Sequence, residues 1–186
     1  MRTFQLLFKV FLVIGIIFPS QAQFKVYSSF KDFENGKGIE YKTYKGNTLA
    51  AGNRTFWFSN AEDGKEKIKV PAKEIWGFTY KDHIFRVDGY MLLMLVSLGK
   101  VAYYENGFAH LDMMIHNSSG STFSDGYFCY LSKSLNSEVI PYKQKDLKKF
   151  TEIHPEAKPL YDCNAHYSDY EAIRKCVAGL QGNEDK

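Results

Sequence analysis

Short segments rich in β-branched and aromatic residues recur along the chain between about residues 38 and 142. Pairs containing Gly, Asn or Asp separate many of them, and these residues tolerate the positive φ of tight hairpins. The segments predicted as strands are 38–44, 54–59, 65–70, 75–81, 84–88, 92–98, 100–105, 108–116, 127–131 and 138–142. Because no helical crossover separates them, the pattern favours an antiparallel meander over parallel βαβ units.

Residues with helical spacing lie on either side of this strand-rich region. Near the N-terminus, Phe30 and Phe33 lie three residues apart, and Ser28 or Ser29 can cap a short helix. Near the C-terminus, residues 169–180 predict the longest helix. Its apolar stripe consists of Tyr170, Ile173, Val177 and Leu180, and Ser168 can cap it. Shorter helical segments are predicted at 146–150 and 155–160.

These elements predict one α+β domain over residues 23–180, followed by a polar tail at 181–186. The expected fold is a β-rich antiparallel meander, as a curled sheet or incomplete barrel, with a short N-terminal helix and C-terminal helices. Residues 92–98 and 127–131 are apolar on both faces of a strand, so a sheet that contains them needs a cover. The C-terminal helices can supply this cover.

The first 22 residues have the composition of a secretory signal peptide. Arg2 and Lys9 precede an apolar stretch at 10–18, and Ser20 and Ala22 are small residues at the −3 and −1 positions. The stretch is shorter than the ~20 apolar residues that span a bilayer. We therefore expect cleavage after Ala22 and an exported protein, either periplasmic, associated with the outer membrane or secreted, without a transmembrane segment.

The charge balance does not indicate a nucleic acid as a partner. The chain has 24 basic and 21 acidic residues, and loss of Arg2 and Lys9 with the signal peptide lowers the net charge from +3 to +1. No sustained basic stripe is present to neutralise phosphates. No motif for a cofactor or nucleotide is present either, so the partner expected is an envelope component or a small ligand.

The three cysteines predict one disulfide and one free thiol. Cys163 and Cys176 lie on either side of a short polar turn, and an oxidising compartment allows them to bridge. Cys129 lies in an apolar strand, where it is expected to be a buried small hydrophobe. A cysteine hydrolase that uses Cys129 with His110 or His116 is the less favoured alternative, because apolar surroundings raise the pKa of a thiol.

Residues 108–116 contain the cluster of side chains that most resembles a metal site. In a strand, one face of this segment carries His110, Asp112 and His116, and the other carries Leu111, Met113 and Ile115. Six residues of strand span roughly 20 Å, so His116 cannot reach a metal held by the other two. We therefore expect a solvent-facing, dispensable polar face and no metal.

Aromatic residues make up 16% of the chain. Trp57, Trp76 and Tyr80 are candidates for contacts with a sugar or an apolar ligand. The alternative is that they fill a sheet core, because aromatic residues are good strand formers. The favoured function is a non-catalytic secreted or periplasmic binding or structural protein. A small-ligand or glycan carrier with an aromatic-lined pocket is the alternative.

Four segments resemble a group of exported, β-rich proteins of Gram-negative bacteria that have no known activity. The matching segments are 28–33 (SSFKDF), 74–82 (EIWGFTYKD), 101–105 (VAYYE) and 146–150 (DLKKF). At His83 this chain departs from the group, where a glycine is more common. The resemblance implies an exported protein with the same arrangement of strands and helices and adds no chemistry.

Overall fold

The computed structural model describes residues 24–61, 65–116, 129–167 and 169–181. The signal peptide predicted at 1–22 and the tail residues 182–186 lie outside the described residues. The strands are β1 (Phe24–Tyr27), β2 (Ile39–Tyr41), β3 (Thr43–Ala50), β4 (Asn53–Ser59), β5 (Ile68–Pro71), β6 (Gly77–Tyr80), β7 (His83–Asp88), β8 (Met91–Leu98), β9 (Ala102–Asn106), β10 (Cys129–Ser132) and β11 (Ile140–Pro141). The α-helices are α1 (Phe30–Glu34), α2 (Gly107–His116), α3 (Gln144–Ile153), α4 (Lys158–Asp162) and α5 (Tyr170–Gln181), and two 3₁₀ turns are η1 (Ala72–Glu74) and η2 (Pro155–Ala157).

The expected fold class is confirmed: the protein is α+β with antiparallel strands. The larger sheet has eight strands in the order β11-β10-β9-β8-β7-β6-β1-β2 and is not closed. The strands from β6 to β11 form a meander, because each pairs with its neighbour in sequence. The sequence analysis missed β1, which pairs with both β2 and β6. The smaller sheet has the order β3-β4-β5.

One row of buried side chains crosses six strands of the larger sheet on a single face. The row consists of Val26, Phe78, Phe85, Met94, Glu105 and Cys129, each paired in register with the next. All six are at most 7% exposed. Such cross-strand neighbours are normally matched in polarity. Glu105 is the one charged residue in this row.

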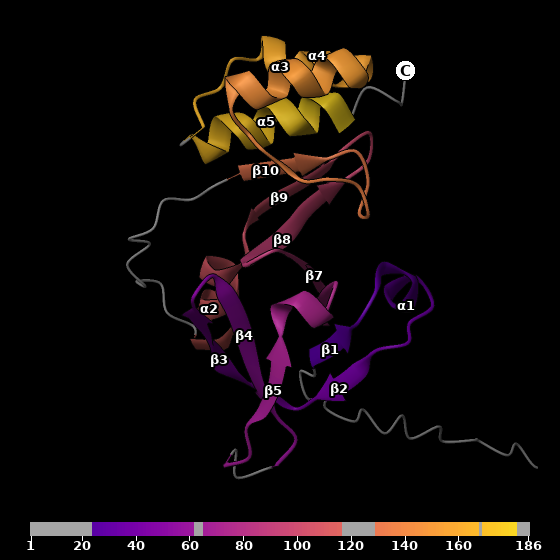
Figure 1. Cartoon of the computed structure of the whole chain (residues 1–186). Helices are drawn as coiled ribbons and strands as arrows, with labels where there is room; N and C mark the ends of the chain where they lie inside the picture. Colours follow the sequence, from indigo (N-terminus) through magenta and orange to yellow (C-terminus); the bar gives the residue numbers. More distant parts are fainter. Residues whose placement is uncertain (1–23, 62–64, 117–128, 168, 182–186) are drawn as a thin grey trace, which may run out of the picture.

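Two covers lie side by side on this face (Figure 1). The sheet β3-β4-β5 and α2 cover the part formed by β1, β6, β7 and β8, and their buried side chains form a core rich in aromatic rings. Helices α3, α4 and α5 cover β9 and β10 and form a second core that is mostly aliphatic. Residue Glu105 therefore lies where the aromatic core meets the aliphatic core.

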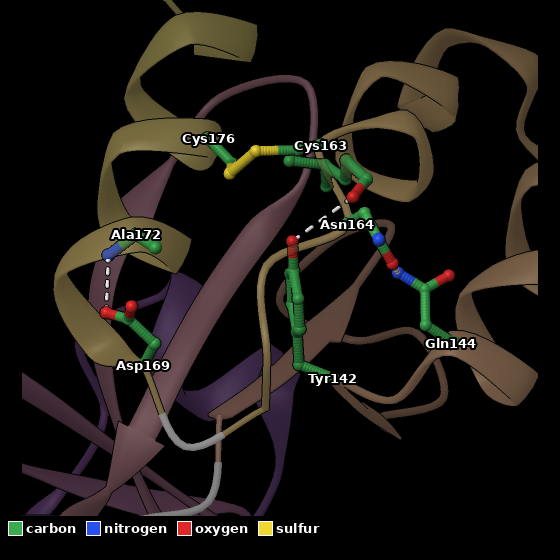
Figure 2. Close-up of a disulfide and its surroundings, with 8 residues drawn as sticks. Tyr142, Gln144, Cys163, Asn164, Asp169, Ala172 and Cys176 are labelled. Carbon is green, nitrogen blue, oxygen red and sulfur yellow. Dashed lines mark hydrogen bonds between the residues drawn. A yellow bond between two sulfur atoms is a disulfide. The ribbon is translucent and has the colours of Figure 1, made fainter.

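The predicted disulfide between Cys163 and Cys176 is confirmed. It joins the residue that follows α4 to the middle of α5, with the two Cα atoms 6.2 Å apart (Figure 2). Nearby, the Tyr142 hydroxyl donates to the Leu160 carbonyl at 3.2 Å. The hydrogen bond attaches α4 to Tyr142, which follows strand β11, and the disulfide attaches the end of α4 to α5.

Residue Asp169 caps α5: its Oδ1 accepts a hydrogen bond from the backbone N–H of Ala172 at 3.0 Å (Figure 2). The predicted cap, Ser168, lies outside the described residues. Gln181, which the sequence analysis placed in the tail, is the last residue of α5. Its side chain binds the backbone N–H of Lys100 at 2.7 Å and the Val101 carbonyl at 2.9 Å. Thus α5 is fixed to the sheet at its C-terminal end.

The prediction of a strand at 108–116 is wrong, because residues Gly107–His116 form helix α2. Asn106 and Gly107, one of the Gly- and Asn-containing pairs expected to turn the chain between two strands, instead form a junction between strand and helix, where Asn106 Oδ1 accepts from the Phe108 N–H at 3.0 Å. A Cβ at Gly107 would lie 2.9 Å from backbone atoms of Leu92. The absence of a side chain at Gly107 therefore lets the start of α2 approach β8 closely.

Candidate functional site

A groove of about 630 Å³ lies between strand β3 and helix α2. Its lining is formed by residues 43–47 on one side and by one face of α2 on the other. The α2 residues are Phe108, Leu111, Asp112, Ile115 and His116. Consecutive side chains of a strand point to opposite faces of the sheet, so a groove on one face would be lined by every second residue. This groove is lined by five consecutive residues of β3 and therefore lies along the edge of that strand.

The edge of β3 that faces away from β4 is unpaired among the described residues, because β3 is the outer strand of its sheet. A bulge lies in this strand: Tyr44 pairs with Phe58 and Gly46 with Trp57, while Lys45 has no partner on β4. Gly46 has φ of +108°, which glycine adopts without strain. Bulges of this kind redirect a side chain at the edge of a sheet.

Polar groups lie around Tyr44 and Asn47 in the lining of the groove. Asn47 Nδ2 donates to the Tyr44 hydroxyl at 2.9 Å, and Arg54 Nη1 donates to Asn47 Oδ1. The Arg54 guanidinium lies over the Phe108 ring, 4.1 Å from its centroid, and its Nε donates to the Tyr90 carbonyl at 2.6 Å. These contacts hold the side chains of Tyr44, Asn47 and Arg54 in place.

The phenol of Tyr44 is neutral at physiological pH. Burial raises the pKa of Tyr44 to about 12, against smaller opposing effects of Asn47 and Arg54. Because the Tyr44 oxygen accepts from Asn47, its own hydrogen is available to a ligand. On the α2 side of the groove, His116 Nε2 lies 3.6 Å from Asp112 Oδ1, one turn earlier in the helix. The groove thus combines an apolar floor with neutral and charged hydrogen-bonding groups.

None of the three aromatic residues singled out from the sequence lines this groove, and each has different neighbours. Trp57 is on β4, where its Nε1 lies 3.4 Å from Thr48 Oγ1. Trp76 packs against Phe30 and Phe33, and its buried Nε1 has no hydrogen-bond partner in the described part of the chain. Tyr80 is in the aromatic core, stacked on Phe24 at 4.2 Å between centroids. The structure therefore does not assemble them into one platform.

A second cluster of polar side chains surrounds the buried Glu105 carboxylate. Arg174 of α5 donates to it through Nε and Nη2, both at 2.6 Å, and His110 Nε2 of α2 lies 2.8 Å from Oε2. Tyr103 donates its hydroxyl to Oε1 at 2.9 Å. The prediction that His110 faces solvent is thus wrong: it is 9% exposed and bound at the junction of the two covers.

The Glu105 carboxylate is held in its charged form. Burial by itself raises the pKa of Glu105, but hydrogen bonds from His110, Arg174 and Tyr103 outweigh it and lower the pKa to about 2. The hydrogen bonds between Arg174 and Glu105 raise the pKa of Arg174. A saturated carboxylate of this kind is a structural anchor that joins β9, α2 and α5, because no lone pair of it is directed to a ligand.

Cys129 lacks the environment of a nucleophile. Its Sγ lies 3.1 Å from the Tyr103 hydroxyl, whereas His110 is engaged with Glu105. Burial raises the pKa of the Cys129 thiol to about 12, so the thiol is protonated at neutral pH. A cysteine hydrolase needs a thiolate next to a histidine. The geometry of Cys129 therefore does not support the hydrolase alternative.

Within residues 24–61, 65–116, 129–167 and 169–181, no group of three or more His, Cys, Asp or Glu is placed to hold a metal ion. In the same ranges, no helix has the length and apolar character needed to cross a membrane. Comparison of the chain with protein-family models, with curated proteins and with solved structures finds no match. The site must therefore be interpreted from its own geometry.

Sequence reasoning missed both sides of the groove. Residues 38–44 were predicted as one strand, and the bulge at Lys45 and the length of β3 gave no signal in hydrophobic alternation. The helical face of α2 was missed because polar and apolar residues in this segment also alternate with the two-residue period of a strand. The i, i+3, i+7 spacing of the apolar residues Phe108, Leu111 and Ile115 was the available helical signal.

Proposed function

We propose that this protein is an exported, non-catalytic binding protein and that the groove between β3 and α2 holds its ligand. The observation that carries the proposal is the groove itself, where an unpaired strand edge lies beside an amphipathic helix face. Recognition sites commonly combine an apolar floor with a few placed polar groups. Here Leu111 and Ile115 form the floor, and Tyr44, Lys45 and Asp112 supply polar groups.

The interior of the fold supports an open groove rather than an internal cavity as the ligand site. The space between the two sheets is filled by aromatic rings in contact with one another. Phe78, for example, lies within 6.0 Å, centroid to centroid, of Phe24, Phe56, Phe58 and Phe85. Interiors packed to this extent leave no room for a guest molecule. A carrier with its ligand inside the curled sheet is therefore less well supported.

Binding can be tested with the chain from residue 23 to 186. The immobilised protein is exposed to two probe sets, a glycan array and a phage-displayed library of random peptides. The variant Lys45→Glu/Ile115→Glu changes both sides of the groove, and Lys148→Glu/Ile153→Glu makes the same exchanges on α3, where Ile153 is 74% exposed. We expect a ligand whose affinity falls about tenfold or more in the groove variant only.

Two results contradict the proposal. One is that neither probe set yields a ligand. The other is that ligands bind the groove variant and the α3 variant equally well. Circular dichroism checks that both variants fold, and Lys45→Glu alone replaces the double variant if Ile115→Glu destabilises α2.

We also propose that the mature protein begins at Gln23, which the small residues Ser20 and Ala22 support. The intact mass of protein recovered from an envelope or culture fraction is expected to match residues 23–186, or that mass less ammonia if Gln23 cyclises. Recovery of envelope protein that still contains Met1 contradicts this.

A further inference from the structure

We infer that the ligand of the groove is an extended polypeptide segment of another protein, which pairs with β3 as a fourth strand of the small sheet. This inference rests on the proposed function and names its ligand class. Strand addition requires an unpaired edge and a neighbouring surface that receives alternate side chains of the added strand. The edge of β3 and the face of α2 provide these two parts.

The dimensions fit a short peptide. The groove is lined by five consecutive residues of β3, Thr43–Asn47, and five residues of extended chain span roughly 16 Å. Helix α2 presents apolar side chains to the groove at Phe108, Leu111 and Ile115, one turn apart along its axis. A strand placed between β3 and α2 directs every second side chain toward these three apolar side chains of α2. The expected peptide therefore has apolar residues at alternate positions.

Charge favours an acidic residue in the peptide. Asp112 and His116 of α2 lie beside each other, whereas Lys45 has no acidic partner among the described residues. Lys45 is also the bulged residue, whose side chain is displaced from the ladder with β4. An acidic side chain of the peptide opposite Lys45 would supply the missing countercharge.

The same lysine argues against a second copy of this chain as the occupant. Antiparallel pairing of β3 with β3 around the bulge would bring two Lys45 side chains together, and like charges opposite each other destabilise strand pairs. A lysine and a bulge at a sheet edge are devices that prevent self-association. The like charges of two Lys45 side chains therefore disfavour a second copy, whereas an acidic segment carries the opposite charge.

The test uses the chain from residue 23 to 186 and peptides selected from the phage-displayed library. A selected peptide is resynthesised with one backbone N-methyl group at each position in turn. We expect affinity to fall about tenfold or more at every second position and to stay within about threefold at the others, since only alternate N–H groups face β3. Hydrogen exchange in Thr43–Asn47 should slow when the peptide binds.

Specificity provides a second readout. Selection on wild-type protein should enrich acidic residues, and selection on Lys45→Glu should enrich basic ones. Selection on the control Lys148→Glu should match wild type.

Three outcomes overturn this inference. The first is that glycans bind the groove and peptides do not, which leaves the proposed function intact. The second is that peptides bind but show no alternation of N-methyl effects or no protection of β3. The third is that light scattering finds a dimer in which hydrogen exchange of Thr43–Asn47 is slowed without peptide, which makes a second copy the occupant. Failure of all probes to bind in the groove overturns the proposed function instead.

Discussion

The two covers on the face of the eight-stranded sheet are attached in different ways. The aromatic region, formed by β3-β4-β5 and α2, is held by packed rings and carries the open groove. The helical region, formed by α3, α4 and α5, is held by a mostly aliphatic core, a disulfide and several polar anchors. Short helices gain little stability on their own, so most of theirs must come from tertiary attachment.

The two regions also differ in how many attachments hold their outer elements. The helical region fixes α5 at its start by the Asp169 cap, near its middle by the disulfide and at its end by Gln181. In the aromatic region, β3 is bound to the rest on one side only. Glu105 joins the two regions, because its carboxylate binds His110 of α2 and Arg174 of α5.

The largest effect is expected in the aromatic region. Phe78→Ala removes a fully buried ring that contacts four other phenylalanines, and loss of such a ring costs about 3–5 kcal/mol. Urea unfolding followed by circular dichroism measures it. Tyr90→Ala, whose side chain is 55% exposed, should change the free energy of unfolding by less than about 1 kcal/mol. Equal effects of the two substitutions would show that the buried aromatic rings do not stabilise the core.

Removal of the disulfide should weaken the helical region specifically. Cys163→Ser/Cys176→Ser opens a loop with a sequence separation of 13, which corresponds to about 3 kcal/mol in the chain-entropy model. Limited proteolysis should cut α4 and α5 before the sheet unfolds. In wild type, thiol labelling after denaturation without reductant should detect one cysteine, Cys129. Three labelled thiols would mean that the bridge is not formed.

Acid should weaken the junction between the two regions. The pKa of Glu105 is lowered from 4.5 to about 2, so its stabilising contribution is present above pH 4.5 and is lost as the pH falls toward 2. The difference amounts to at most about 3 kcal/mol. Urea unfolding at pH 7, 4 and 3 should show this loss in wild type and a smaller slope in Glu105→Gln. Identical slopes would show that Glu105 does not titrate with unfolding.

The smallest effect is expected at the start of α5. Asp169→Ala removes the side chain that accepts from the Ala172 N–H, and loss of an N-cap typically costs about 1 kcal/mol. Thermal unfolding measures it, and Asp169→Asn, which keeps an acceptor oxygen, should restore most of the stability. If Asn is no better than Ala, the cap is not the reason for the loss.

The sequence by itself determined the fold class, most strands and the disulfide. Runs rich in β-branched and aromatic residues, separated by turn residues, predicted β4, β6, β7 and β8, because strand propensity and turn chemistry depend mainly on local geometry. The sequence also predicted α1, whose cap Ser29 accepts from the Asp32 N–H. Export after Ala22 stays a prediction from sequence, since residues 1–22 lie outside the described residues.

Only the tertiary structure decided the conformation of residues Gly107–His116, the position of the groove and the partners of Glu105. In this segment the apolar residues fit both a strand and a helix, and contact with β8 selects the helix. Glu105 gave no sign of burial in the sequence, because its partners come from residues as far as 69 positions away. A charged residue can occupy an apolar row of a sheet only when the fold brings enough hydrogen-bond donors to it, and no local pattern records that arrangement.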